Sequence, residues 1–234
     1  MSFPVRAITL DLDDTLWPIG PAINRAEEQL DAWMKAHAPR SFARWPQAKR
    51  RKLREQVDLE RPHLSHDMTV QRQWMLERML AEAGDDIALM PAAYEAYFAG
   101  RCDVKHYGDS VPALDRLAAR VPLAAISNGN ADLQRIGLMH LFRFQLGARE
   151  HGRAKPSPCI FHAACAQLDV APMHVLHVGD DPDADVIGAH RAGLRTCWIN
   201  RERRTWPRRD IQPDLQFTNL AALADWLDAA SPKS

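Results

Sequence analysis

The chain has 234 residues, more than the commonest domain size, which allows one large domain or a domain with a sizeable insertion. With 46% hydrophobic and 26% charged residues, the composition is typical of a folded globular protein and excludes a disordered or fibrous chain. Lysine plus arginine (30) equals aspartate plus glutamate (30), and no apolar stretch approaches the roughly 20 residues of a membrane span. We therefore expect neither nucleic acid nor a membrane as a partner.

The N-terminal region lacks the pattern of a secretory signal, because Asp11 interrupts its short apolar run. The four cysteines show no CxxC spacing, so they are interpreted as small buried residues without metal or redox chemistry. Together these features predict a cytoplasmic protein.

The first predicted element is a strand over residues 5–10, which ends at the acidic cluster Asp11-Leu-Asp-Asp-Thr15. From about Ala22 to about Asp103, apolar residues recur every three or four positions, which predicts about four helices and no strand. Prolines and glycine at 39–46, at 62 and at 84–91 are expected to separate them. This pattern predicts a helical domain over residues 18–107, inserted into a catalytic core made of residues 1–17 and 108–234.

After Gly108, helical patterns alternate with short β-rich runs, as in βαβ units. The predicted helices are Ser110–Ala119, Pro158–Leu168, Pro182–Ala192 and Leu220–Ala229. The predicted strands are Pro122–Ile126, Val175–Val178, Arg195–Ile199 and Leu215–Phe217. With the first strand they predict an α/β fold, a Rossmann-like parallel sheet core with an inserted helical-bundle domain.

Ligands of an open parallel sheet bind beyond the carboxyl ends of its strands, and three predicted strands end in polar clusters. These clusters are Asp11, Asp13, Asp14 and Thr15; Ser127, Asn128, Gly129 and Asn130; and Gly179, Asp180 and Asp181 with Asp185 nearby. Lys155 stands just before the predicted helix that starts at Pro158. We expect these side chains to form one site.

Several carboxylates at one sheet edge repel one another unless a cation is present, and hard oxygen donors suit Mg²⁺. A carboxylate can attack phosphorus while a second carboxyl protonates the leaving alcohol and later activates water. Asp11 and Asp13 are two residues apart, so an extended segment turns both to one side. Ser127 and Lys155 are suited to binding phosphate oxygens and offsetting their charge. The pattern predicts phosphoryl chemistry.

These motifs, in this order, resemble those of the haloacid dehalogenase-like (HAD) superfamily, and the resemblance covers nearly the whole chain. It implies that the helical insertion is a cap domain and that the cofactor is Mg²⁺. It also implies that Asp11 is nucleophile and metal ligand, and that Asp13 is the acid/base with its backbone carbonyl on the metal. The other implied roles are phosphate binding by Ser127, Asn128 and Lys155, metal binding by Asp180, and orientation of Lys155 or of a water by Asp185.

Three phrases around these motifs, Ile126-Ser-Asn-Gly-Asn130, Gly152-Arg-Ala-Lys-Pro156 and His177-Val-Gly-Asp-Asp181, resemble bacterial flavin mononucleotide phosphatases. Those enzymes also act on a phosphorylated riboflavin precursor, 5-amino-6-(5-phospho-D-ribitylamino)uracil. The resemblance implies a Mg²⁺-dependent phosphomonoester hydrolase that works through an aspartyl-phosphate on a small phosphorylated metabolite. FMN or that precursor is the expected substrate.

Three other functions remain open from the sequence. A 2-haloacid dehalogenase attacks carbon without a metal and by resemblance lacks the second aspartate, so Asp13 and Asp180 argue against it. A phosphomutase keeps the same carboxylates and differs only in the acceptor of the phosphoryl group. A non-enzymatic regulatory module would not need the whole set of charged groups.

Asp181 precedes Pro182, a pattern that favours a helix cap over a metal ligand.

Overall fold

The computed structural model describes residues 3–230 of the chain and divides it into two compact units. The first, which we call the sheet unit, consists of Met1–Pro18, Lys105–Gly129 and Leu133–Ser234. The second, the helical unit, consists of Ile19–Val104 and the short segment Asn130–Asp132. Each is a separate body with its own buried core.

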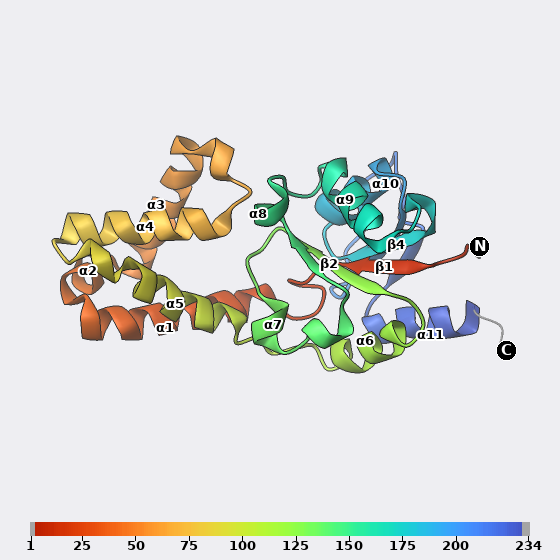
Figure 1. The fold of residues 1–234 in the computed structure, drawn as a ribbon, viewed down its shortest axis with the longest axis horizontal. Coiled ribbons are helices and arrows are strands. Elements are labelled where there is room, and N and C mark those ends of the chain that lie inside the picture. Colours follow the sequence, from red (N-terminus) through yellow and green to blue (C-terminus); the bar gives the residue numbers. More distant parts are fainter. Residues whose placement is uncertain (1–2, 231–234) are drawn as a thin grey trace. The chain divides into compact units, whose positions relative to one another are not determined.

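The sheet unit is built on a parallel sheet of six strands in the order β3-β2-β1-β4-β5-β6 (Figure 1). The strands are β1 (Ala7–Leu10), β2 (Leu123–Ser127), β3 (Gln145–Gly147), β4 (Val175–Gly179), β5 (Arg195–Ile199) and β6 (Leu215–Phe217). All residues of β1, β2 and β4 are buried, as expected for central parallel strands covered on both faces. The predicted α/β fold is confirmed.

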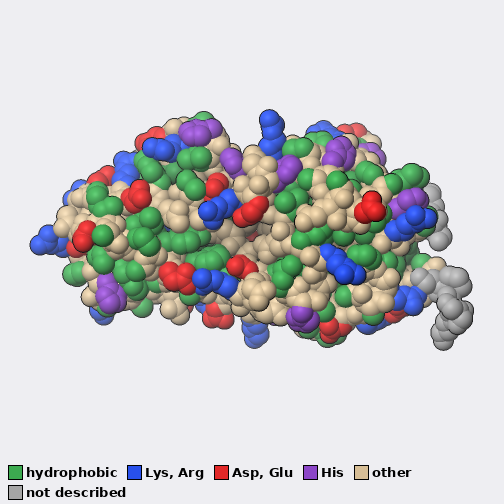
Figure 2. Space-filling view, in the orientation of Figure 1, with side chains coloured by type: hydrophobic (Ala, Val, Ile, Leu, Met, Phe, Trp, Pro, Cys, Tyr) green, Lys and Arg blue, Asp and Glu red, His purple; other side chains and the backbone are tan. Residues whose placement is uncertain are grey.

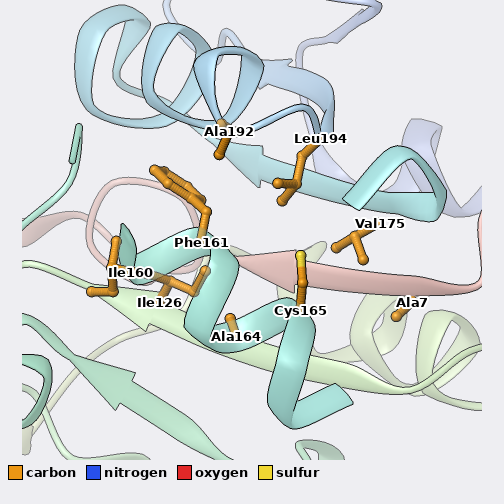
Figure 3. Packing of buried hydrophobic residues seen from close by; sticks show 10 residues of the cluster. Ala7, Ile126, Ile160, Phe161, Ala164, Cys165, Val175, Ala192 and Leu194 are labelled. Atoms are coloured by element: carbon orange, nitrogen blue, oxygen red, sulfur yellow. The ribbon is translucent and has the colours of Figure 1, made fainter. Parts of the chain in front are cut away.

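Helices cover both faces of this sheet, with α9 and α10 on one face and α6 and α11 on the other (Figure 1). Those of the sheet unit are α6 (Ser110–Ala118), α7 (Leu133–Ile136), η3 (Met139–Leu141), α8 (Ala148–His151), α9 (Pro158–Leu168), η4 (Pro172–His174), η5 (Pro182–Ile187), α10 (Gly188–Arg191) and α11 (Leu220–Ala230). Phe161 and Cys165 of α9 pack with Ile126 of β2 and Val175 of β4 in a cluster of buried side chains (Figure 3). This apolar layer holds the strand ends in place.

Two parts of the sheet unit differ from the sequence-based prediction. Strand β3, with its flanking short helices α7 and α8, was not predicted, because its sequence Gln-Leu-Gly has no β-branched residue and only its pairing to β2 makes it a strand. The helix predicted over Pro182–Ala192 is two segments, a π-helical turn η5 followed by α10. Such a widened turn is frequent at functional sites.

The described helical unit contains five α-helices rather than about four. They are α1 (Ile19–His37), α2 (Pro39–Arg44), α3 (Gln47–Glu60), α4 (Met68–Ala83) and α5 (Met90–Cys102), with the 3-10 turns η1 (Pro62–Leu64) and η2 (Ile87–Leu89). The predicted break at 39–46 is instead helix α2, because Pro39 lies in its first turn, where no hydrogen-bonded N–H is needed. A Cβ on Gly100 would lie 2.7 Å from the backbone of Ala26, so this glycine allows α1 and α5 to cross closely.

A buried ion cluster lies among the apolar side chains of the helical unit. Glu27 accepts from Arg50 through its Oε2 (3.0 Å from Nε) and from Arg72 through its Oε1 (2.9 Å from Nη1). Arg72 also donates to the hydroxyl of Tyr97 (3.0 Å), and Arg50 pairs with Asp31 (2.7 Å). These contacts join α1, α3, α4 and α5. The guanidinium of Arg72 therefore has its partners inside the helical unit.

Charged side chains of both signs are interspersed on the face shown in Figure 2, in keeping with the balanced net charge. Within residues 3–230, no helix combines the length and apolarity that a bilayer crossing requires.

Candidate active site

The site lies where the sheet changes direction. The chain builds β2 and β3 on one side of β1 and then returns to build β4, β5 and β6 on the other side. In open parallel sheets, ligands bind at the carboxyl edge beside this switch point. Asp11 follows β1 there, and its N–H donates to the carbonyl of Val178 in β4 (2.9 Å). Asp180 follows β4, so the two carboxylates share this edge.

Three aspartates form a carboxylate cluster at this edge. Asp11, Asp180 and Asp185 each place a carboxylate oxygen so that the three oxygens lie within 4.8 Å of one another. Asp11 and Asp185 are buried, and the side chain of Asp180 is about one-fifth exposed. The hydroxyl of Thr15 lies 3.5 Å from both Asp11 and Asp180. Such a set of closely spaced oxygen donors fits a hard divalent cation.

Lys155 joins two members of the cluster. Its Nζ lies 2.5 Å from Oδ1 of Asp11 and 2.7 Å from Oδ1 of Asp185, and the side chain is buried. Asp185 also contacts His177, whose Nε2 lies 3.1 Å from the same Oδ1. The other ring nitrogen of His177 lies 2.9 Å from the hydroxyl of Thr9. A continuous buried chain of polar contacts therefore runs from β1 and β4 to the Asp11 carboxylate.

Burial and repulsion raise the pKa values of two of the aspartates. Burial, followed by the charges of Asp11 and Asp185, raises the pKa of Asp180 to about 8. Burial also raises the pKa of Asp11, to about 7, although the charge of Lys155 opposes this rise. Without added positive charge, both groups tend to keep protons near neutral pH. A cation bound between them would restore their ionised forms.

The pKa values of Asp185 and His177 are lowered, whereas that of Lys155 is raised. Burial by itself would raise the pKa of Asp185, but the charge of Lys155 and the hydrogen bond with His177 outweigh it and hold that pKa well below its usual range. Burial would lower the pKa of Lys155, and the negative charges of Asp11 and Asp185 more than compensate. Burial lowers the pKa of His177. Lys155 and Asp185 thus stay charged while His177 is neutral.

Asp13 lies in a tight turn that follows Asp11. Its Oδ1 accepts a hydrogen bond from the indole N–H of Trp17 (2.9 Å), and the backbones of Asp13 and Trp17 form an isolated bridge. Asp14 between them has a positive φ of 56° and donates its N–H to the carbonyl of Trp17 (2.7 Å). A left-handed residue reverses the chain, and aspartate tolerates that conformation better than most residues.

Ser127 and Asn128 follow β2. The hydroxyl of Ser127 is buried and accepts the N–H of Gly129 (3.0 Å), which leaves its own proton to be donated. The side-chain amide of Asn128 binds the backbone of Lys155 in both directions, with its Nδ2 2.9 Å from the Lys155 carbonyl and its Oδ1 2.8 Å from the Lys155 N–H. Asn128 therefore holds Lys155 in place, while phosphate binding by its backbone N–H stays a prediction.

Asp181 caps the turn after β4, as interpreted from the sequence. Its Oδ1 accepts the N–H groups of Asp183 (2.8 Å) and Ala184 (2.7 Å). The N–H of Asp181 in turn donates to Oδ2 of Asp185 (3.0 Å). A Cβ on Gly179 would come within 2.2 Å of the Asp185 carboxyl, so only glycine leaves room for this carboxylate.

Strand β5 and the loop after it contribute contacts that the sequence motifs do not indicate. The indole N–H of Trp198 donates to the backbone carbonyl of Asp180 (2.8 Å), and the guanidinium of Arg204 lies 3.8 Å from the Asp180 carboxylate. Arg201 donates to the carbonyl of Thr15 (2.9 Å) and pairs with Asp109 (2.8 Å). Arg201 and Arg204 are absent from the predicted site; the signal that could have identified them is their position just past a strand that ends at the same sheet edge.

The described site thus brings together the predicted Asp11, Lys155, Asp180 and Asp185, with Ser127 and Asn128 at the end of β2. The contacts of Thr9, His177 and Trp17 were missed. In the sequence each of these polar or aromatic residues looks like an ordinary strand or turn residue, and only the chain packing reveals its partner.

Comparisons with known proteins identify the family of this chain. A family model for haloacid dehalogenase-like hydrolases matches residues 5–193. The chain is 36% identical to the 5-amino-6-(5-phospho-D-ribitylamino)uracil phosphatase YigB of Escherichia coli K12, over 94% of each protein. It is 30% identical to the glyceraldehyde 3-phosphate phosphatase of Methanopyrus kandleri, over 94% of this chain and 96% of that one. A crystal structure of a 2-haloacid dehalogenase from Pseudomonas syringae pv. tomato DC3000 matches with a TM-score of 0.90 and 34% identity, over 97% of this chain and all of that chain.

A match over most of the chain, together with relatives of this identity and coverage, confirms the resemblance drawn from the motifs. The protein belongs to the haloacid dehalogenase-like hydrolases.

Proposed function

We propose that this protein is a Mg²⁺-dependent phosphomonoester hydrolase in which Asp11 is the nucleophile. The observation that carries the proposal is the carboxylate cluster of Asp11, Asp180 and Asp185 beside Lys155. Similarity to proteins named as phosphatases supports the same reaction class.

The residues of the cluster fit Mg²⁺. They supply hard oxygen donors within 4.8 Å of one another, and burial, which raises the pKa values of Asp11 and Asp180, is a cost that a bound cation would offset. Asp11, Asp180 and the backbone carbonyl of Asp13 would hold the ion. When bound, it would neutralise the carboxylates and the phosphate oxygens and so let two anions approach each other.

The reaction would use two carboxylates in turn. A carboxylate oxygen of Asp11 forms a bond to phosphorus, and the bond from phosphorus to the alcohol oxygen breaks. Asp13 gives its proton to that departing oxygen. Asp13 then takes a proton from water, whose oxygen attacks the aspartyl-phosphate, releases inorganic phosphate and restores Asp11. Ser127 and Lys155 bind the phosphate oxygens throughout, so charge and orientation are set before the chemistry begins.

For the substrate, we propose FMN or the phosphorylated riboflavin precursor that YigB is named for. Support comes from 36% identity over nearly the whole length of both proteins and from the motif phrases. In this proposal the helical unit is the cap domain that selects the substrate, and the enzyme acts in the cytoplasm. Transfer to a sugar hydroxyl instead of water would make the protein a phosphomutase, and that outcome is separated by whether inorganic phosphate is released.

A 2-haloacid dehalogenase is the second candidate, because a structure of such an enzyme is similar over nearly the whole chain. Displacement of halide from carbon by a carboxylate needs no cation, whereas the clustered carboxylates of this site repel one another without one. Asp13 also has no role in halide departure, since halide leaves without a proton. The phosphatase hypothesis therefore explains more of the side chains in the site than the dehalogenase hypothesis does.

One experiment separates these candidates. Purified protein is assayed with p-nitrophenyl phosphate, FMN and 2-chloropropionate, each with Mg²⁺ and with EDTA. We expect phosphate release that stops with EDTA and returns with Mg²⁺, and no chloride release. Chloride release in EDTA without phosphatase activity would establish the dehalogenase instead.

The division of labour between the first two aspartates can be tested separately. Asp13→Asn should slow turnover far more than it weakens Mg²⁺ binding, because only the backbone carbonyl of Asp13 is proposed as a ligand. A loss of Mg²⁺ affinity as large as the loss of turnover contradicts that assignment.

A further inference from the structure

We infer that Trp17 is a positioning residue that orients Asp13 for proton transfer to the leaving group. The inference rests on the proposed function, in which Asp13 is the acid/base. The observation that carries it is a hydrogen bond of 2.9 Å from the indole Nε1 of Trp17 to Oδ1 of Asp13. Tryptophan is among the largest side chains, and here it is fully buried.

An aspartate carboxyl rotates easily about its last side-chain bond, since that torsion has broad minima. An acid/base must nevertheless stay within hydrogen-bond reach of the atom it protonates. The ring of Trp17 cannot move with the carboxyl, because it is buried and meets the ring of His106 edge-on at a centroid distance of 5.6 Å. A rigid donor at a fixed distance therefore limits the orientations that the Asp13 carboxyl can adopt.

The chemistry of the donor adds a second effect. An indole N–H donates and cannot accept, so its partner oxygen must act as an acceptor. Oδ1 of Asp13 is then favoured as the acceptor in both protonation states, and the transferable proton is directed to Oδ2. A tyrosine or serine at position 17 could reverse its hydrogen bond and would not impose this choice.

The backbone keeps the donor in register with the acceptor. The N–H of Asp14 donates to the carbonyl of Trp17 (2.7 Å), and the N–H of Leu16 donates to the carbonyl of Leu12 (2.8 Å). The carbonyl of Leu16 also accepts from the hydroxyl of Ser110 (2.8 Å). The turn from Asp13 to Trp17 is thus held by internal hydrogen bonds and by a hydrogen bond to the start of α6. The side chains of Asp13 and Trp17 therefore extend from a backbone of fixed geometry.

The test uses the dependence of rate on leaving-group acidity. A series of substituted phenyl phosphates, from p-nitrophenyl to p-methoxyphenyl phosphate, is assayed with Trp17→Phe, which keeps an aromatic ring and removes the N–H. Acidic leaving groups need little help from an acid, whereas basic ones do. We expect kcat/KM for p-nitrophenyl phosphate to change less than about threefold and that for p-methoxyphenyl phosphate to fall about 10- to 100-fold.

Three further variants give the readout that a merely structural role would not change. In Asp13→Asn the leaving-group dependence should be steeper still, and adding Trp17→Phe should have no further effect, because coupled residues are not additive. Trp198→Phe is the matched control, since Trp198 is equally buried but donates to the Asp180 carbonyl. Its loss of rate should be uniform across the series.

The failures are distinguishable. A uniform loss in Trp17→Phe, or a loss that persists on the Asp13→Asn background, overturns the inference and leaves the acid/base role of Asp13 intact. If the dependence of kcat/KM on the leaving group is no steeper in Asp13→Asn than in the unsubstituted protein, the proposed acid/base assignment itself is overturned. If Trp17→Phe does not fold, replacement of Trp17 by β-(3-benzothienyl)alanine keeps the bicyclic volume without the N–H and decides the same question.

Discussion

Binding of Mg²⁺ should release protons, because the metal-free site holds them. The pKa of Asp11 is raised to about 7 and that of Asp180 to about 8, mainly by burial. At pH 6 both carboxyls are therefore mostly protonated, and at pH 9 both are mostly ionised. Since the ion binds the ionised forms, about two protons leave at pH 6 and almost none at pH 9. The two pKa values imply that the apparent Mg²⁺ affinity rises about a thousandfold over this range.

Isothermal titration calorimetry in two buffers of different ionisation enthalpy measures both the affinity and the number of protons released. Asp180→Asn is the control, because it removes the group with the higher pKa and should cut the proton release at pH 6 to about one. An affinity that varies by less than about threefold between pH 6 and pH 9, with no proton release, would refute the account of the cluster.

The same pKa values predict how stability changes with pH. A carboxyl whose folded pKa lies above its unfolded pKa stabilises the fold at low pH, and this stability is lost as the pH rises through the folded pKa. Metal-free protein should therefore melt at lower temperature as the pH rises from 7 to 8, where folded Asp180 loses its proton, and Mg²⁺ should reverse the trend. In that window Asp185 is ionised in both the folded and the unfolded states, and His177 is neutral in the folded state and mostly neutral in the unfolded state, so their contributions are small.

Substitutions at four positions test other parts of the structure. Asp11→Asn should abolish phosphate release, measured after contaminating phosphatase and deamidation are excluded; retained activity would contradict the nucleophile assignment. Glu27→Leu leaves two buried arginines without their shared carboxylate and should lower the free energy of unfolding by about 3–5 kcal/mol in urea titrations, and a loss under about 1 kcal/mol would show that the pairs contribute little. Asn128→Ala frees the backbone of Lys155 and should reduce kcat about 10- to 100-fold at nearly unchanged melting temperature, whereas a large melting shift with normal kcat would assign it to stability alone. His177→Leu should lower kcat about tenfold while His177→Gln, which can still hydrogen-bond, retains more activity; equal losses would argue against positioning through hydrogen bonds.

Much of the fold follows from local patterns in the sequence. The strand Arg195–Ile199 and the helix Pro158–Leu168 were predicted with the bounds that the structure has, because β-branched and aromatic residues favour the strand and a proline at the first helical position marks the start of the helix. Strand β3 could not be predicted, because its three residues become a strand only by pairing with β2. A break was predicted where helix α2 lies, because prolines mark helix starts as well as interruptions.

The candidate site divides in the same way. Asp11, Asp180 and Lys155 could be found from the sequence because each follows a strand or precedes a helix, and the carboxyl ends of parallel strands meet at one edge. The contact between Thr9 and His177 joins residues 168 positions apart, and the Trp17 indole reaches Asp13 only through a left-handed residue between them.

The sequence by itself therefore determined which chemical groups the protein has and at which edge of the sheet they gather. The tertiary structure decided which carboxylate pairs with Lys155, which one is held by His177 and which ones keep their protons. The physical reason is that pKa values and orientations depend on burial and on partners within a few ångströms, and packing between distant segments creates both.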